Sequence, residues 1–223
     1  MTLMLQDTLS PSALDCFLQH CHVKNYPAKS SILRAGEINK TLFFILEGSV
    51  SVGIEDEEDG RRLIYAYLNK GEFIGEIGIF NTAKPIGANV RTRSRCKLAE
   101  IPYGKFQQVL KKELAEYSTE ILFIIGKQLA TRLLITSRNF RDLAFMDTEG
   151  RVARTLLDLC LEPDAIIYPE GRQIKITRQE LSQIVGCSRE VAGRVLKELE
   201  NKNMISMDGK KILVFEPLIT QSL

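Results

Sequence analysis

The chain has 223 residues, of which 44% are hydrophobic and 26% are charged, and its formal net charge is +2. This composition excludes a disordered, collagen-like or low-complexity chain, and no run reaches the ~18 apolar residues of a membrane span. The N-terminus has no signal-peptide pattern and the five cysteines are scattered and odd in number, so we expect a cytoplasmic protein with free thiols.

The first half of the chain predicts one short helix followed by many strands. Residues 8–23 carry apolar side chains at helical spacing, namely Leu14, Phe17, Leu18 and Cys21. Eight of the 15 glycines then lie between Gly36 and Gly87. They separate short β-branched and aromatic runs that predict strands: TLFFILEG, SVSVGI, RLIYAYLN, NVRTR and CKLAEI. The charged run GIEDEEDGRR predicts a hairpin tip, and the whole pattern indicates a sandwich or barrel.

Helical spacing returns after residue 101. A first helix is predicted over 103–112 and a long one over 113–144, with Ile121, Ile125, Leu129 and Leu133 at every fourth position. Apolar residues also lie outside that stripe. Such a helix is either buried in a core or packs one face on its own barrel and another on a partner helix; a length of ~45 Å favours the second interpretation and hence a dimer.

The last third of the chain predicts a compact α+β unit. Asp147 or Thr148 caps a helix that Pro163 ends. A turn over 168–171, a strand QIKIT, two helices and a hairpin with Asp208 and Gly209 at its tip follow. The predicted organisation is therefore a β-rich domain over 1–112, a helix and hinge over 113–145, and a small domain over 146–223, in the α+β fold class.

The segment from Thr177 to Leu199 carries the strongest local pattern. Thr177 and Glu180 form a capping box before a helix over 178–185, Gly186 supplies a sharp turn, and Ser188 caps a second helix. Ser182 is small where the two helices approach each other. The predicted buried seam consists of Leu181, Ile184, Val185, Val191, Val195 and Leu199. This spacing is typical of a helix-turn-helix.

Charged residues on this segment suit DNA. Residues 172–211 contain nine basic and five acidic residues, so binding would rest on a local patch. Arg189, Glu190 and Arg194 are placed to read base edges, and Arg178, Gln179 and Lys210 to bond phosphates. The plain alternative is a helical hairpin with solvated charges; the flanking strand and the following hairpin, which would form a wing, favour DNA.

The chain resembles the cyclic AMP receptor branch of the receptor/fumarate-nitrate regulator superfamily. The resemblance covers nearly the whole length and rests on LQHCHVKNYPAKS, LEGSVSV, YLNKGEFIGEIGIF, LAFMDTEGRVARTLLDL and QIKITRQELSQIVGCSREVAGRVLKELE. It implies an N-terminal cyclic-nucleotide-binding β-roll, a long dimerisation helix and a C-terminal winged helix. It also implies a homodimer that bends palindromic DNA and recruits RNA polymerase.

The resemblance assigns roles to single residues. Arg189, Glu190 and Arg194 match the base readers for half-sites similar to TGTGA, and Arg178, Gln179 and Ser188 match phosphate contacts. His20, His22 and Lys105 match a surface that touches polymerase; surface solvation of the two histidines is the plain alternative. The loop Ile166 to Gly171 corresponds to another polymerase-contacting loop, although its sequence IIYPEG is less polar than usual.

The effector site matches only in part. The run Phe73 to Gly78 corresponds to the phosphate-binding cassette, where Gly75 lets the backbone approach a phosphate and Glu76 is the candidate ribose ligand. Thr136 and Ser137 match residues that bond the adenine base, and Arg132 matches a position at the site's edge. Where the family has an Arg-Ser or Arg-Thr pair, this chain has Ile86 and Gly87.

Three interpretations of the effector follow from that replacement. The chain binds cyclic AMP weakly or with Lys84 in place of the missing arginine; it binds another ligand, such as cyclic di-GMP; or it binds DNA without an effector. Lysine is a point charge and lacks the bidentate fork of arginine, which favours loss of tight cyclic AMP binding. The structural alternative is that none of these residues binds a ligand: Thr136 and Ser137 would lie in a dimer seam, and Glu76 would cap a turn.

Other functional classes have less support. The sequence contains no phosphate-binding P-loop, no metal-spaced His/Cys set and no nucleophile elbow, so we expect neither an enzyme nor a metal protein. Cys16 and Cys21 are too few for an iron–sulfur sensor, and no residue pattern favours haem. A regulatory nucleotide-binding subunit of an enzyme would lack the segment from Thr177 to Leu199.

Overall fold

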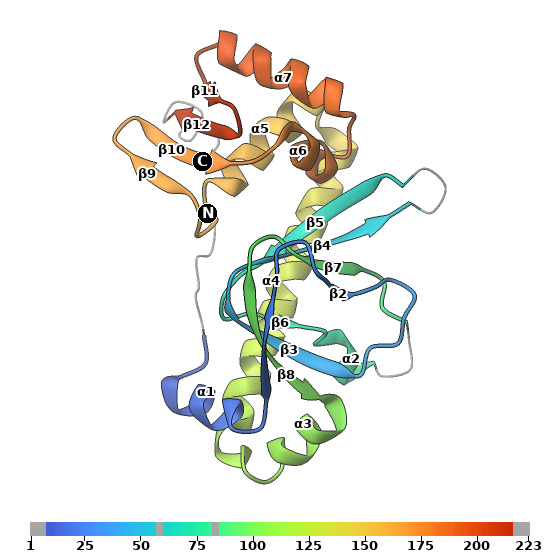
Figure 1. Ribbon diagram of the computed structural model, residues 1–223. Helices are drawn as coiled ribbons and strands as arrows, with labels where there is room; N and C mark the ends of the chain where they lie inside the picture. The colour runs from blue at the N-terminus through green and yellow to red at the C-terminus, as the bar shows by residue number, and fades with distance from the viewer. Residues whose placement is uncertain (1–7, 57–59, 82–84, 216–223) are drawn as a thin grey trace. The chain divides into compact units, whose positions relative to one another are not determined.

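The computed structural model describes residues 8–56, 60–81 and 85–215. The chain divides into two compact units, an N-terminal unit made chiefly of residues up to Thr136 and a C-terminal unit made chiefly of residues from Ser137 onward. Figure 1 shows the helices and strands of each unit. No helix of the described residues is long and apolar enough to cross a membrane.

The N-terminal unit is a β-roll of two four-stranded sheets. One sheet has the order β1-β8-β3-β6 and the other the order β2-β7-β4-β5. The strands are β1 (His22–Tyr26), β2 (Ser31–Leu33), β3 (Thr41–Glu47), β4 (Val50–Glu55), β5 (Arg62–Leu68), β6 (Phe73–Ile74), β7 (Asn89–Thr92) and β8 (Cys96–Pro102). Strand β3 is buried on both faces: Phe43 and Ile45 face the other sheet, while Leu42 and Phe44 face the helices.

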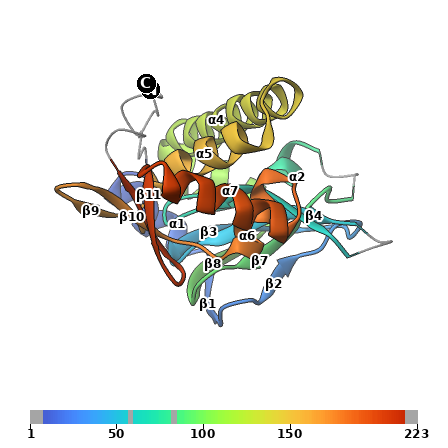
Figure 2. The same cartoon turned by 90° about the horizontal axis from the view of Figure 1, so that it is seen from above.

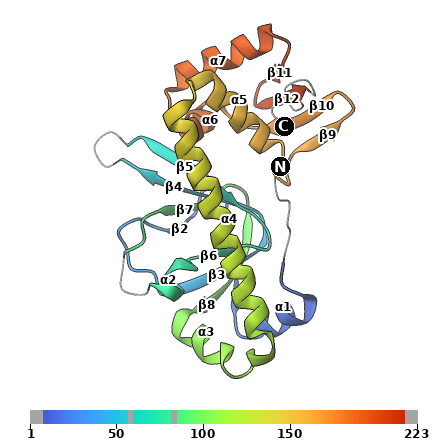
Figure 3. The same ribbon diagram turned by 180° about the vertical axis from the view of Figure 1, so that it is seen from behind.

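Four helices belong wholly or partly to this unit. They are α1 (Pro11–Leu18), α2 (Ile77–Phe80), α3 (Tyr103–Leu110) and α4 (Ser118–Phe145), the last preceded by a 3-10 turn over Ala115–Tyr117. Phe17 of α1 is completely buried and makes edge-to-face contacts with the rings of Phe44, Phe73 and Phe106, with centroids 5.8 to 6.3 Å apart. Ile121 and Ile125 complete this core from α4, which runs along β3 and β6 (Figure 3).

The C-terminal unit is a winged helix. It contains α5 (Thr148–Leu159), α6 (Arg178–Val185) and α7 (Arg189–Asn201), and a sheet of order β11-β12-β10-β9. The strands are β9 (Ile166–Tyr168), β10 (Gly171–Lys175), β11 (Ile205–Asp208) and β12 (Lys211–Phe215). The core side chains Leu156, Leu181, Leu199 and Val214 are at most 1% exposed. The predicted fold class, with a β-roll, a long helix and a winged helix-turn-helix, is confirmed.

Several predicted element boundaries were wrong. The helix predicted over 8–23 ends at Leu18, because residues from His22 onward pair with β8, from His22↔Glu100 to Tyr26↔Cys96. The long helix begins at Ser118 rather than Glu113, because Leu114 is completely buried and its N–H bonds the Val109 carbonyl at 2.8 Å. The tip of the hairpin over 53–62 lies partly outside the described residues.

Candidate nucleic-acid interface and effector site

Two helix N-caps and one glycine C-cap define the helix-turn-helix, at the predicted residues. Thr177 caps α6, its Oγ1 accepting from the Glu180 N–H at 3.0 Å, and Ser188 caps α7, its Oγ accepting from the Val191 N–H at 3.2 Å. Between them Gly186 has φ +72°, the left-handed conformation of a helix C-cap. These local groups fix where each helix begins and ends.

The seam between α6 and α7 is apolar. Leu181, Val185, Val195 and Leu199 are buried, whereas Ile184 and Val191 are only half-buried at its margin. Ser182 is 3% exposed, and its hydroxyl donates to the Gln179 carbonyl at 2.8 Å within its own helix. A small side chain satisfied inside its own helix lets the two helices approach closely.

The surface of this motif carries every predicted DNA-contacting residue. The exposed residues are Arg178, Gln179, Ser188, Arg189, Glu190, Arg194 and Lys210. The backbone N–H of Glu190 and the Ser188 hydroxyl bond the Glu190 carboxylate, and with Arg189 they lower its pKa below the ordinary value. Glu190 therefore stays ionised and keeps its capacity to accept hydrogen bonds.

Helices α6 and α7 lie side by side (Figure 2), and residues from separate elements meet at the start of α6. A Cβ on Gly193 would lie 3.5 Å from Cδ of Arg178, so the Arg178 side chain runs across α7. Lys210 lies in the two-residue turn between β11 and β12, and its carbonyl accepts from the Ile176 N–H at 2.9 Å. The wing turn is thus joined to the segment that enters α6, which brings Lys210 to the same end of the unit as Arg178.

The second site is built on the turn after β6. Gly75 has φ +84°, and a Cβ there would lie 2.7 Å from Nδ2 of Asn39, so only glycine fits. The Tyr103 hydroxyl donates to the Gly75 carbonyl at 2.5 Å and accepts from Asn39 Nδ2 at 2.6 Å. Asn39 and Tyr103, which sequence reasoning missed, therefore hold this turn in place.

Glu76 follows that turn and is only 4% exposed. Nη1 of Arg132, on α4, lies 2.5 Å from Oε1 of Glu76. The same guanidinium contacts Glu72 at 3.1 Å and the Phe73 carbonyl at 2.9 Å, while its Nε has no partner in the described part of the chain. The structure thus brings the predicted residues Glu76 and Arg132 together and adds Glu72, a carboxylate that the sequence did not single out.

Of the two positions that replace the expected arginine pair, Ile86 is turned toward the protein and Gly87 is exposed. The Ile86 N–H donates to the Glu37 carbonyl and its carbonyl accepts from the Gly36 N–H, both at 2.9 Å. The Ile86 side chain packs on the core between the sheets. A Cβ on Gly87 would meet nothing within 4 Å, so space is open there. Lys84 lies outside the described residues.

The remaining predicted residues lie on surfaces. Thr136 and Ser137 are exposed on α4. His22 and Lys105 are exposed and His20 is half-buried. Burial raises the pKa of the Cys21 thiol, which lies between the two histidines in the sequence, to about 12, and the charge of Lys105 opposes that rise. His22 begins strand β1 rather than ending a helix.

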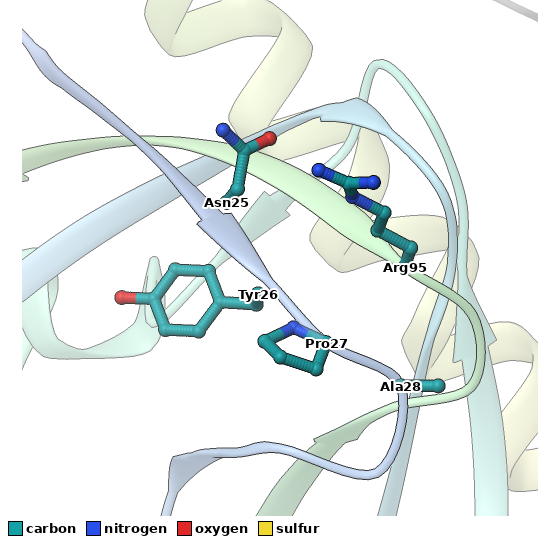
Figure 4. Close-up of a pocket in the computed structure, with 5 residues that line it drawn as sticks. All are labelled: Asn25, Tyr26, Pro27, Ala28 and Arg95. Atoms are coloured by element: carbon teal, nitrogen blue, oxygen red, sulfur yellow. The ribbon is translucent and has the colours of Figure 1, made fainter.

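Two cavities lie away from these sites. One, of about 420 Å³, is lined by Asn25, Tyr26, Pro27, Ala28 and Arg95 at the end of β1 (Figure 4). The other is a groove of about 510 Å³ on α4, lined by Leu122, Phe123, Gly126, Lys127 and Ala130. No group of three or more His, Cys, Asp or Glu side chains in the described ranges is arranged to hold a metal ion.

Both domains of the chain match known protein families, and relatives match over most of its length. Residues 23–113 match the cyclic nucleotide-binding domain family, and residues 150–217 match the Crp-like helix-turn-helix domain family. The chain is 52% identical over 205 residues to the cAMP-activated global transcriptional regulator Vfr of Pseudomonas aeruginosa, covering 91% of this chain and 93% of Vfr. It is 49% identical over 202 residues to the cAMP-activated regulator CRP of Salmonella typhimurium, with the same coverage.

Solved structures have the same fold. The c-di-GMP responsive regulator CLP of Xanthomonas campestris superposes with a TM-score of 0.86 at 41% identity, covering 92% of this chain and 99% of CLP. A CooA mutant from Carboxydothermus hydrogenoformans superposes with a TM-score of 0.75 at 16% identity, covering 98% and 97%. At that identity CooA supports the fold alone.

Proposed function

The chain belongs to the CRP/FNR family of transcriptional regulators, and from this membership we propose how it reads DNA, pairs with a second copy and responds to its effector. The family regulates transcription rather than catalysing a reaction, and its two domains bind a cyclic nucleotide and DNA. We infer a homodimer in the cytoplasm that recognises palindromic DNA and contacts RNA polymerase. The observation that carries this proposal is the capped, exposed start of α7.

Direct readout is assigned to three residues. Arg189 and Glu190 occupy the first two positions of α7, and Arg194 lies on its exposed side. The N-terminal part of a recognition helix faces base edges in the major groove. Arginine bonds guanine O6 and N7 with two donors and glutamate accepts from cytosine N4, which fits G·C pairs of a TGTGA-type half-site.

Backbone contacts are assigned to four further exposed residues, Arg178, Gln179, Ser188 and Lys210. Arg178 lies across Gly193, beside the base-reading helix, and Lys210 is joined to the start of α6 through Ile176. Contacts with phosphates fix the register of a protein on the duplex without reading sequence. We therefore expect these residues to set affinity and Arg189, Glu190 and Arg194 to set specificity.

The dimer surface is assigned to the exposed side of α4. Phe123, Ala130 and Leu134 follow one another at intervals of seven and four residues, and Phe123 and Leu134 are 72% and 66% exposed. Residues at these intervals share one helix face. At 3.6 residues per turn, this face lies opposite the one that carries the buried Ile121 and Ile125. The small Gly126 and Ala130 form the floor of the groove on that face and allow a partner helix to approach.

The effector site is assigned to the segment around Glu76. The match of residues 23–113 to the cyclic nucleotide-binding domain family supports a cyclic nucleotide as the effector class, and the residues present fit one in part. Glu76 offers a carboxylate for a ribose hydroxyl, and Gly75 forms the tight turn that precedes it. Gly87 leaves room for a phosphate, and Thr136 and Ser137 offer hydroxyls to a base. Arg132 at the edge of the site holds Glu76 in position through their ion pair.

Among the described residues, position 86 provides no counter-charge for a cyclic phosphate, because it is an isoleucine. Ile86 packs on the core and both of its backbone groups are bonded to the Gly36–Glu37 segment. We therefore propose that cyclic AMP binds more weakly than it would with an arginine at residue 86. The second candidate is cyclic di-GMP, favoured by the likeness to the c-di-GMP responsive CLP; DNA binding without an effector is the third.

Polymerase contact is assigned to His20, His22 and Lys105; the two histidines flank Cys21, whose thiol pKa is raised by burial and lowered in part by the charge of Lys105. The loop from Ile166 to Gly171 is a second candidate surface. Ile166 and Ile167 are 52% and 76% exposed on the edge strand β9, so the contact there would be apolar rather than polar.

Fluorescence anisotropy tests the proposal. A labelled palindromic TGTGA-type duplex is titrated with protein at one fixed salt concentration, because affinity depends on salt. The titration is done with no nucleotide, with cyclic AMP and with cyclic di-GMP, against a scrambled duplex. Preference for the palindrome supports the DNA assignment, and equal affinity for both duplexes refutes it. A change in affinity with one nucleotide identifies the effector.

A further inference from the structure

Strand β6 lies at the edge of its sheet. It is two residues long, and within the described ranges it pairs only with β3, through Phe43↔Ile74 and Phe44↔Phe73. Phe73 and Ile74 are at most 1% exposed, so their backbone groups are shielded from water. Buried N–H and C=O groups need partners, and on the free edge of β6 no strand provides them.

Side chains of α4 provide those partners instead. Oε1 of Gln128 accepts from the Phe73 N–H at 3.0 Å, and Nε2 of Gln128 donates to the Gly71 carbonyl at 3.0 Å. One turn later Nη2 of Arg132 donates to the Phe73 carbonyl at 2.9 Å. The Gln128 carboxamide therefore makes the two bonds that a peptide group of a neighbouring strand would make.

These bonds lie directly before the effector residues. Gly71 and Phe73 lead without a break into Gly75 and Glu76, and Arg132 bonds both Phe73 and Glu76. The helix that provides Gln128 also carries the exposed Phe123 and Leu134. A shift of α4 relative to the β-roll would thus move the Gly71–Glu76 segment or break its bonds to Gln128.

We propose that Gln128 is a positioning residue that holds the Gly71–Glu76 segment to α4 and so couples the effector site to the dimer helix. This inference rests on the proposed function in two respects, namely that Glu76 contacts the effector and that α4 is the dimer helix. Gln128 touches no ligand in this assignment and acts through the backbone of Gly71 and Phe73.

Two variants and a matched control test the proposal. Gln128→Ala removes both bonds. Gln128→Glu keeps an acceptor for the Phe73 N–H but loses the donor to the Gly71 carbonyl. Thr131→Ala is the control, since Thr131 is exposed on the same helix between Gln128 and Arg132. Circular dichroism first verifies that all three full-length variants are folded.

Hydrogen exchange by mass spectrometry, without any nucleotide, is the first measurement. We expect exchange over residues 71–76 to accelerate on the order of tenfold in Gln128→Ala and less in Gln128→Glu. It should stay unchanged in Thr131→Ala and over β7 in every variant. Unchanged exchange over 71–76 in Gln128→Ala overturns the proposal, as does faster exchange over the whole β-roll, which would indicate general destabilisation.

The second measurement is the ratio of DNA affinities with and without cyclic AMP. We expect both Gln128 variants to reduce this ratio relative to wild type and Thr131→Ala to leave it unaltered, which a merely structural role would not predict. An unaltered ratio in Gln128→Ala overturns the coupling. If the wild type itself does not respond to cyclic AMP, that result counts against cyclic AMP as effector, and the exchange measurement alone decides the role of Gln128.

Discussion

Arg132 and Glu76 form a 2.5 Å ion pair in which the glutamate side chain is 5% exposed and the arginine side chain 19% exposed. The carboxylate assigned to ribose is therefore already paired within the protein. Removing one member of a largely buried pair leaves the other charge without compensation, which costs more than the pair itself contributes.

We expect Arg132→Met to lower the free energy of unfolding by about 3 kcal/mol. Urea denaturation followed by circular dichroism measures it. The double variant with Arg132→Met and Glu76→Gln is the control, because it also removes the stranded charge, and it should recover at least about half of the loss. Equal destabilisation of the single and double variants would show that the unpaired charge of Glu76 does not contribute to the loss of stability.

The DNA assignment separates residues that read bases from residues that hold the backbone. Arg189→Ala should weaken binding to the palindrome by about 1–3 kcal/mol and relax the preference at one guanine position. Anisotropy with duplexes substituted at each position measures both effects. Unchanged sequence preference would contradict the assignment of Arg189 as a base reader.

Arg178→Ala serves as the contrasting variant. It should weaken binding to palindromic and scrambled duplexes alike and reduce the slope of log affinity against log salt by about 1. A salt series on the same two duplexes gives the slope. Loss of affinity for the palindrome alone would move Arg178 from the phosphate contacts to the base readers.

Position 86 allows a gain-of-function test. Ile86→Arg should tighten cyclic AMP binding roughly 10- to 100-fold, because a charge-assisted hydrogen bond contributes about 1.5–3 kcal/mol. Isothermal titration calorimetry measures the affinity, and Ile86→Leu, which keeps the apolar contact with the core, is the control. A variant that remains folded with no gain would mean that residue 86 does not face the phosphate.

The exposed side of α4 allows a test of assembly. Leu134→Glu places a charge where a partner helix would pack, and we expect monomers at micromolar concentration together with loss of tight binding to the palindrome. Sedimentation velocity gives the mass. Gln107→Glu, which adds the same charge at an exposed position on α3, should remain dimeric. A dimeric Leu134→Glu variant would exclude this face as the interface.

Local signals explain why the helix-turn-helix could be predicted almost to the residue. Thr177, Gly186 and Ser188 act within three residues of their own positions, so the sequence contains all that is needed to locate the ends of α6 and α7. The cap at Asp147 is of the same kind, its Oδ1 accepting from the Gly150 N–H at 2.8 Å.

Non-local contacts explain what could not be predicted. Strand β1 comes directly after the apolar residues at helical spacing that end at Cys21. Its extended form arises from pairing with β8, some 70 residues away in the sequence. The partners of Phe73 come from Gln128 and Arg132, which are 55 and 59 residues distant. A polar residue on a helix gives no sign in the sequence that it substitutes for a strand, so Gln128 became visible only in three dimensions.

The free edge of β6 also bears on how the protein can be divided. A recombinant fragment that stopped before Ser118 would contain every strand of the β-roll but neither Gln128 nor Arg132, and it would uncover the aromatic cluster around Phe17. Such a fragment would aggregate or lose its Gly71–Glu76 turn. The smallest autonomous effector module therefore extends along α4 at least to Arg132, which bonds both Phe73 and Glu76.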